Sequence, residues 1–574
     1  MRTKYFIATV LSSLAFASCN YLDFDETSNL KTKEDIYKYF DSSQSMLTHV
    51  YSFMPQGYPL FSTYEDTGGE TYSMRDCASD DGEFGAVSGN IQKVNNGNWS
   101  PISTYDDAWK LYAGIRAANN FIEDIANVDF SRYEHQASYQ NWLKMLKYFP
   151  YEARVLRAYY FFELARRYGD IAMPLTALDK EGANSIGKTA FNDVIDFIVS
   201  ECDEATKENN LPESYAKEPD AQIGRITKGF AMAVKSKALL YAASKLHNPS
   251  MNTELWKRSA QAALDIINTG LYSLNPQESM NNIQSPEVVL MRMNAENTRF
   301  ELYNFPIRYT EGQRTSNLDH GNYPSQNLVD AFETVNGYKV TLENTGWVSE
   351  DPQFNPQSPY ENRDPRFYRT ILANGMNFKG SAIETFKNGK DYTVVSQGGT
   401  PTGYYLRKYI QETTSFTPNS TVSNKHHWVI YRYAETLLTY AESMINAFGD
   451  ANYTNETYNK YSALWALNEV RKNAGMPVIL SCGKDEFIER LYNEWRVEFA
   501  FEDHRFWDIR RWKIGDATQR ELYGVKIEKQ SDGTLKYYKN LYETRIWKDC
   551  MYLYPIPQSE LYKNPNLNPQ NEDW

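Results

Sequence analysis

The feature that most constrains the fold of this chain is a recurring pair of amphipathic helical segments. In residues 152–170, "EARVLRAYYFFELARRYGD", apolar side chains recur every three or four positions and form one stripe. Gly169 follows the last apolar position, where glycine ends a helix because it tolerates a left-handed conformation. The next segment, "TAFNDVIDFIVSECDEATK", repeats the pattern, with Thr189 as its expected N-cap. Two such neighbours predict a helical hairpin.

The same pairing occurs twice more. "TKGFAMAVKSKALLYAASKL" precedes "TELWKRSAQAALDIINTG", and "YRYAETLLTYAESMINAFGD" precedes "TYNKYSALWALNEVRKNAG". Small side chains let a neighbouring helix approach closely, which is how hairpin repeats stack. The first helix of each pair carries alanine at such positions: Ala158 and Ala165, Ala238 and Ala242, Ala434 and Ala441. We therefore expect a mostly α-helical fold on a tetratricopeptide-like scaffold, with hairpins over about 105–270 and 428–515.

Two long irregular excursions interrupt this scaffold. Residues 55–101 are rich in Gly, Asn, Asp and aromatic side chains. Residues 271–427 are rich in Pro, Gly and Asn, with only short β-like runs such as "EVVLMRM" and "YKVTL". Connections of this length are uncommon in compact domains unless they are functional or disordered. We expect both excursions to carry ligand-binding loops and to contribute only minor β structure.

Composition and motifs argue against several function classes. A formal charge of −13 disfavours a nucleic-acid partner. The chain contains no H-E-x-x-H, G-x-S-x-G, P-loop or G-x-G-x-x-G motif, and its five cysteines form no C-x-x-C pair. The stretch "DCASDDGEFG", beginning at Asp76, lacks the alternating acids of an EF-hand loop. We therefore expect no catalytic residue, no metal and no cofactor.

Residues 502–512, "EDHRFWDIRRW", concentrate charge and aromatic side chains. The density of charge is compatible with an active site. The interpretation that we favour is a set of ion pairs along and between helices, over a packed aromatic layer. The expected ion-pair members are Arg496, Glu498, Arg505, Asp508 and Arg510, and the expected aromatic layer is Phe501, Phe506 and Trp507.

The N-terminus reads as an export signal. A basic start, an apolar run over residues 5–14 and small residues after it describe a signal peptide over residues 1–18, and the run is too short to span a bilayer. Two processing outcomes compete. Ala15-Phe16-Ala17 has the form of an ordinary cleavage site, whereas Phe16-Ala17-Ser18-Cys19 resembles a bacterial lipobox, whose cysteine becomes acylated.

Several of these stretches together carry a family resemblance. They are "EARVLRAYYFFELARRYGD", "ENRDPRFYRTILANG", "YRYAETLLTYAES", "LNEVRKNAGMP", "ERLYNEWRVEFAFEDHRFWDIRRWK" and "YPIPQSELYKNPNLNPQNEDW". In this order they resemble the SusD/RagB family of nutrient-binding surface lipoproteins of Bacteroidetes-type bacteria. The resemblance runs from Cys19 to the last residue, which predicts a single SusD-like domain over residues 19–574.

The resemblance implies an anchor, a place and a partner. Members of this family begin with a lipidated cysteine followed by acids, so it favours lipidation of Cys19, with Asp23, Asp25 and Glu26 as an export signal to the outer face. The implied location is the outer membrane, lipid-anchored and facing the cell exterior. The implied partner is a SusC-like TonB-dependent transporter, to which the protein delivers an oligosaccharide or polysaccharide without catalysing a reaction.

The resemblance does not include the residues that contact the ligand, so these are inferred physically. Sugar rings pack their C–H faces on aromatic planes, and their hydroxyls suit Asn, Asp and Arg side chains. In the first excursion we expect Trp99 to be a stacking platform beside Tyr72, with Arg75, Asp81 and Asn98 as hydroxyl partners. In the second excursion Tyr309, Tyr323 and Trp347 are the candidates. The alternative for each residue is ordinary loop packing.

Three functions follow from these observations. The first is capture of glycans by a surface lipoprotein. The second is capture of peptides on the same scaffold, as in a RagB-like branch of the family. The third is glycoside hydrolysis, which needs only two carboxylates at a set separation and which a chain with 73 acidic residues does not rule out.

Overall fold

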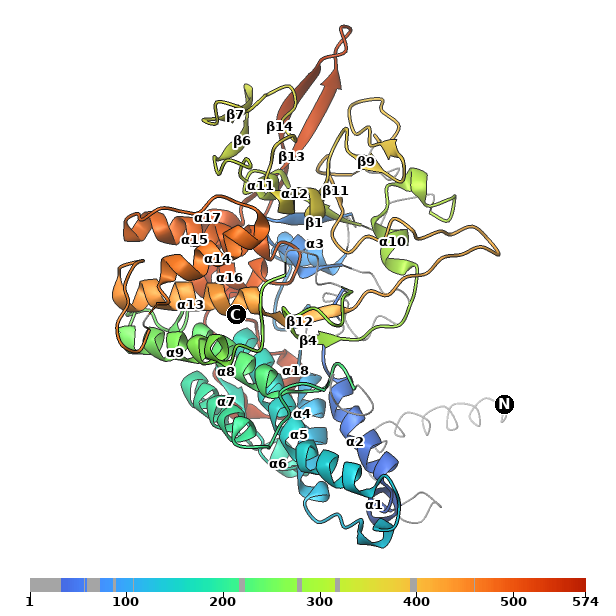
Figure 1. The fold of residues 1–574 in the computed structure, drawn as a ribbon, viewed down its shortest axis with the longest axis vertical. Helices are drawn as coiled ribbons and strands as arrows, with labels where there is room; N and C mark the ends of the chain where they lie inside the picture. The colour runs from blue at the N-terminus through green and yellow to red at the C-terminus, as the bar shows by residue number, and fades with distance from the viewer. Residues whose placement is uncertain are drawn as a thin grey trace, which may run out of the picture.

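The computed structural model describes residues 32–55, 57–58, 73–85, 89–106, 108–215, 222–275, 281–314, 321–392, 400–458 and 460–574. Long helices stack side by side through the lower and left parts of the molecule, and irregular chain and most strands occupy the upper and right parts (Figure 1). The long helices are α2 (Phe40–Ser52), α4 (Leu111–Ile125), α5 (Tyr139–Tyr168), α7 (Phe191–Thr206), α8 (Lys228–Ala243), α9 (Thr253–Thr269), α13 (Tyr433–Phe448), α14 (Ala463–Ala474) and α15 (Lys484–Glu498).

The helices form one continuous stack. Each contacts the next in the order α4, α5, α7, α8, α9, α13, α14 and α15, so the hairpins before and after residues 271–427 pack directly on one another. The approach of α9 to α13 is close, because small side chains meet there: the hydroxyls of Ser259 and Ser443 lie 2.8 Å apart. The predicted fold, mostly helical with stacked hairpins, is confirmed.

Helix α5 begins earlier than the sequence pattern indicated. It starts at Tyr139, contains Pro150, and ends where expected, with Gly169 at φ +71°. Thr189 does not cap the next helix. It pairs with Ile171 in a two-residue strand, and Asp170 instead accepts a hydrogen bond from the first amide of α7, at 2.9 Å.

The remaining elements are short. The short helices are α1 (Lys33–Tyr37), α3 (Asn90–Asn95), α6 (Lys180–Ala183), α10 (Arg299–Asn304), α11 (Gln326–Val329), α12 (Pro365–Thr370), α16 (Arg505–Trp512), α17 (Gly515–Thr518) and α18 (Gln558–Lys563). Every described strand belongs to an antiparallel pair. The pairs are β1 (Gly82–Phe84) with β5 (Asn322–Pro324), β2 (Ile171–Ala172) with β3 (Lys188–Thr189), β4 (Val288–Arg292) with β12 (Trp428–Arg432), β6 (Val340–Glu343) with β7 (Gly346–Ser349), β8 (Ile371–Leu372) with β11 (Tyr405–Leu406), β9 (Asn377–Phe378) with β10 (Ser381–Ala382), and β13 (Glu521–Lys529) with β14 (Leu535–Thr544).

The excursions and the scaffold share a hydrophobic core. The largest cluster of buried apolar side chains runs from Tyr37 to Leu567 and includes residues of both excursions. A second cluster lies between α8, α9, α13, α14 and α15. Among the described helices, none combines the length and the apolar character that crossing a bilayer requires.

Candidate functional site

The two loop excursions meet in the small sheet formed by β1 and β5. Glu83 lies opposite Tyr323 in the register, and Phe84 lies opposite Asn322. The Asn322 side chain accepts a hydrogen bond from the Met74 amide at 2.8 Å, and the Ser325 amide donates to the Asp81 carbonyl at 2.9 Å. Segments that are more than 200 residues apart in the sequence are thus joined, as a shared ligand surface requires.

Arg75 fastens the first excursion to the helical scaffold. Its guanidinium pairs with Asp106 at 2.8 Å and with Asp503, and it lies 4.9 Å from the centre of the Trp507 ring. The side chain is only 1 % exposed. The predicted role of Arg75 as a sugar-hydroxyl partner is therefore wrong, because its donors point into the protein and are engaged there.

The acids that follow Arg75 act in the same way. Asp80 accepts from Arg505 at 2.8 and 2.9 Å, and Asp81 accepts from Arg496 at 2.7 Å. Burial by itself would raise the pKa of Asp80, but the two arginines outweigh it and lower the pKa to about 2. Asp81 is fully buried, so its predicted ligand role is also wrong. Within the described chain, no three His, Cys, Asp or Glu side chains are grouped to hold a metal ion.

The second excursion is fastened to the same helices. Arg366 pairs with Glu494 at 2.5 Å and with Glu498 at 2.8 Å. Arg432, at the end of β12, pairs with Glu498 at 2.7 Å and with Glu502 at 2.8 Å. Residues 494–505 therefore form a charged spine to which residues of both excursions are tied by ion pairs, and the ion-pair interpretation is confirmed for Arg496, Glu498 and Arg505.

Arg510 departs from that interpretation. Instead of pairing with a carboxylate, it donates to the Phe506 carbonyl at 2.9 Å and lies 3.4 Å from the centre of the Phe506 ring. Burial lowers the pKa of Arg510 to about 10. The other expected members, Arg496, Arg505 and Asp508, take part in ion pairs.

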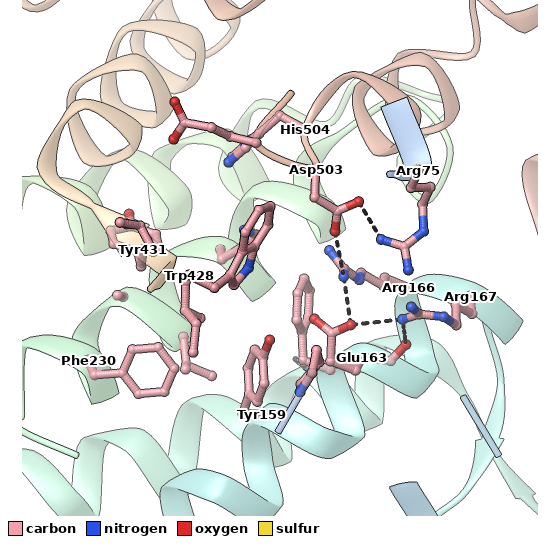
Figure 2. Close-up of a pocket in the computed structure, with 18 residues that line it drawn as sticks. Arg75, Tyr159, Glu163, Arg166, Arg167, Phe230, Trp428, Tyr431, Asp503 and His504 are labelled. Atoms are coloured by element: carbon pink, nitrogen blue, oxygen red, sulfur yellow. Dashed lines mark hydrogen bonds and ion pairs between the residues drawn. The ribbon is translucent and has the colours of Figure 1, made fainter. Parts of the chain in front are cut away.

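A small charged cavity lies where α5, α8, β12 and residues 502–504 converge (Figure 2). Glu163 accepts from Arg166 at 2.6 Å and from Arg167 at 2.8 Å, and Asp503 faces Arg75 and Arg166. Burial would raise the pKa of Glu163, but the two neighbouring arginines lower it to about 2. The cavity measures about 50 Å³, far below the roughly 300–1,000 Å³ of common ligand sites. It is a structural junction rather than a site for a sugar.

Trp99 belongs to the core. Its ring meets Tyr554 edge-on at 4.5 Å and Trp574 at 5.3 Å, and it is 3 % exposed. A ring enclosed in this way has no free face, so the predicted stacking role is wrong. The adjacent Asn98 is exposed, and its role as a hydroxyl partner stays a prediction.

Two aromatic candidates of the second excursion are also buried. Trp347, on β7, packs against Tyr360 at 5.6 Å and is 4 % exposed. Tyr323 packs against Tyr405 at 5.8 Å and is 1 % exposed. Both predicted ligand contacts are therefore wrong. Trp347 and Tyr323 do lie in the loop-rich second excursion, as predicted, but the chain around each ring packs over it and buries it.

Among the predicted aromatic residues that the structure describes, Tyr309 keeps surface access. It lies at the edge of the apolar cluster that contains Tyr323, with its ring 4.9 Å from that of Phe378. Arg308 lies 4.6 Å from the centre of the Tyr309 ring, donates to its hydroxyl at 2.7 Å, and pairs with Asp391 at 2.8 Å. We call these three residues the Arg308–Tyr309–Asp391 surface. Its Arg–Asp pair was missed from the sequence, since no local pattern links residues 83 positions apart.

Cys19 and Tyr72 lie outside the described residues, as do the predicted signal peptide over residues 1–18 and the predicted export-signal acids Asp23, Asp25 and Glu26. Their roles stay predictions.

Comparison with known proteins finds relatives that align with nearly the whole chain. The SusD family model matches residues 286–574. SusD-like protein P2 of Formosa agariphila is 23 % identical over 592 aligned positions, covering all of both chains. A solved SusD-like protein from Bacteroides fragilis superposes with a TM-score of 0.74 at 24 % identity, covering 94 % of this chain and 98 % of that one.

A second solved protein from Bacteroides fragilis, described as a SusD-like carbohydrate-binding protein, superposes with a TM-score of 0.70 at 23 % identity. The alignment covers 93 % of this chain and all of that one. Likeness at this level of identity establishes the shared fold, and the family match spans half of the chain and includes the charged spine. This chain therefore belongs to the SusD family.

Proposed function

We propose that this protein is a non-catalytic, cell-surface glycan-binding lipoprotein that captures oligosaccharides or polysaccharide and passes them to a SusC-like TonB-dependent transporter. The observation that carries the proposal is the joining of two long excursions, through β1 and β5, on a scaffold of the SusD family. Such an arrangement brings loops from distant parts of the chain onto one surface, which suits the capture of a ligand.

The Arg308–Tyr309–Asp391 surface supports the choice of a carbohydrate. A partly exposed tyrosine ring with a guanidinium over it offers both apolar surface and hydrogen-bond donors, a combination that suits sugar rings and their hydroxyls. Asp391 is 4 % exposed and holds Arg308 in two parallel hydrogen bonds at 3.0 and 2.8 Å. A donor held in this way loses little conformational entropy when a ligand binds.

A binding experiment tests the proposal. The full chain, purified in detergent, is titrated calorimetrically with maltohexaose, laminarihexaose, cellohexaose, xylohexaose and mannohexaose, and separately with a defined set of oligopeptides. We expect saturable binding of at least one saccharide. Binding of peptides alone would replace the proposal with peptide capture, and sustained release of reducing sugar would identify a glycoside hydrolase.

The membrane anchor is tested separately. We propose that Cys19 is acylated and holds the protein on the outer face of the outer membrane, with residues 19–574 exposed to the exterior. The variant Cys19→Ala is expected to move the protein from the outer-membrane fraction to a soluble fraction, while a Cys202→Ala control, which changes a buried thiol, leaves the fractionation unchanged. Retention of the Cys19→Ala protein in the membrane fraction would contradict lipidation.

A further inference from the structure

A large groove lies on a different part of the molecule from the Arg308–Tyr309–Asp391 surface. One wall is the β6–β7 hairpin with the turn before it, and the other is α15, with Ile514 at one end. Figure 1 shows β6 and β7 above α15 and α17. The groove has a volume of about 1000 Å³, twenty times that of the charged cavity in Figure 2, and ligand sites commonly measure about 300–1,000 Å³.

Each wall carries a tyrosine. Tyr338 is 42 % exposed and follows a tight turn, in which the Thr334 amide donates to the Tyr338 carbonyl and the Gly337 amide donates to the Thr334 carbonyl, both at 2.8 Å. Gly337 has φ +82°, which a glycine adopts without strain. On the opposite wall, Tyr492 stacks on Trp512 with ring centres 3.7 Å apart. The groove therefore offers two aromatic rings, one carried by a hydrogen-bonded turn and one held by stacking.

The polar groups of the groove are balanced in charge. Four acids and four bases line it: Glu333, Glu350, Glu486 and Glu489, and Lys339, Arg490, Arg496 and Arg505. Two of the ion pairs among them, Lys339 with Glu489 and Arg490 with Glu486, are exposed on both sides. Exposed ion pairs contribute little stability, so these groups can turn to ligand hydroxyls at small cost. Arg496 and Arg505 are held by Asp80 and Asp81, and Glu333 is held by Arg471, so most charges that line the groove are already neutralised. A lining of paired charges favours a neutral ligand over a charged polymer.

Val348 and Trp347 show how the hairpin is oriented. Successive side chains of a strand point to opposite faces, so the burial of Trp347 against Tyr360 directs Val348 into the groove. Val348 adds an apolar wall to the two tyrosines. The hairpin itself is held from behind by Asp330, which accepts from the Leu342 amide at 3.1 Å.

From these observations we infer that the groove between the β6–β7 hairpin and α15 is a second saccharide-binding site, which takes a neutral oligosaccharide of a few sugar units. The inference rests on the proposed function, since it assumes that the protein binds glycans. Tyr338 and Tyr492 hold sugar rings, and Arg490, Glu489 and Asn493 meet the hydroxyls. A second site would let one molecule hold a long polysaccharide at two points, which slows its release.

The test compares matched tyrosine variants of the full chain by calorimetric titration with the five hexasaccharides named above. Tyr338→Ala removes the groove ring, Tyr309→Ala removes the ring of the loop surface, and Tyr538→Ala removes a ring of similar exposure, 40 %, on the β13–β14 hairpin. For the saccharide that the wild-type protein binds, we expect two sites per chain. Tyr338→Ala should weaken one of them about fivefold to tenfold, and Tyr538→Ala should change nothing.

Hydrogen–deuterium exchange gives an independent measurement. Saturation with the bound saccharide should protect residues 333–350 and 484–498 in the wild-type protein and protect them less in Tyr338→Ala. Glycan binding at one site per chain, with Tyr338→Ala identical to wild type in both measurements, would overturn the groove site and leave the proposed function standing. Absence of any saccharide binding by the wild-type protein would overturn both.

Discussion

Replacing Arg75 with alanine tests whether this residue fastens a loop or contacts a ligand. The side chain is 1 % exposed and lies between a buried carboxylate, Asp106, and a partly buried one, Asp503. Arg75→Ala leaves both acids in a region from which water is largely excluded, with their principal cation removed. We expect a lower free energy of unfolding, because the first excursion is then held less firmly on the charged spine.

The magnitude follows from the partners that remain. Removing one member of a buried ion pair costs about 3–5 kcal/mol, because the other charge stays buried. Asp106 keeps the Tyr554 hydroxyl at 2.7 Å and Arg167 at 3.4 Å, and Asp503 keeps the Trp507 indole N–H at 3.2 Å and Arg166 at 3.8 Å. These contacts place the expected loss near the lower limit, at about 3 kcal/mol.

Urea unfolding followed by tryptophan fluorescence measures this loss. The matched control is Arg520→Ala, whose pair with Asp516 is exposed on both sides and should contribute less than about 1 kcal/mol. Arg75→Lys keeps the charge but not the forked geometry, so it should fall between wild type and Arg75→Ala and remain measurable if the alanine variant does not fold. Wild-type stability of Arg75→Ala combined with loss of saccharide binding would refute the fastening role.

Two further changes probe other parts of the structure. Trp99→Ala should lower the free energy of unfolding by about 3–5 kcal/mol in the same assay, because it empties the space between Tyr554 and Trp574. The affinity for saccharides should not change. Weakened affinity at unchanged stability would restore the stacking role. Burial raises the pKa of Asp330 to about 6, above its ordinary 3.8, so the folded state loses stability as the pH rises through 6 and Asp330 ionises. Asp330→Asn should therefore raise the free energy of unfolding about 2 kcal/mol more at pH 8 than at pH 4.5, and a difference independent of pH would contradict this account.

The helical scaffold could be predicted because its signal is local. The apolar stripe of residues 152–170 and the glycine after it report burial on one face of a helix within a few turns. The charged stretch 502–512 was also interpretable, since its alternation of charge and aromatic side chains indicates a packed, ion-paired helix. The boundaries were less accurate. Asp170, rather than Thr189, satisfies the first amide of α7, and that choice depends on how the preceding turn folds.

The predicted ligand residues were less reliable than the predicted helices, because the exposure of a side chain depends on the tertiary structure. Asn98 and Tyr309 keep access to solvent, whereas Trp99, Tyr323 and Trp347 are enclosed by aromatic partners far away in the sequence. Nothing within a loop distinguishes a ring that will stack on a ligand from one that will be buried. Composition placed aromatic and polar side chains in the excursions but did not state which way they face.

The sequence by itself determined that this chain forms stacked helical hairpins of the SusD family, because periodicity and motif order are properties of neighbouring residues. Only the tertiary structure decided that Arg75 and Asp81 fasten loops, since their partners Asp503 and Arg496 lie more than 400 residues away. The same holds for the groove between the β6–β7 hairpin and α15, whose walls come from segments more than 130 residues apart. A charged side chain in a loop forms a buried ion pair or stays free to contact a ligand, depending on which segments pack over it. That outcome depends on the packing of the whole chain.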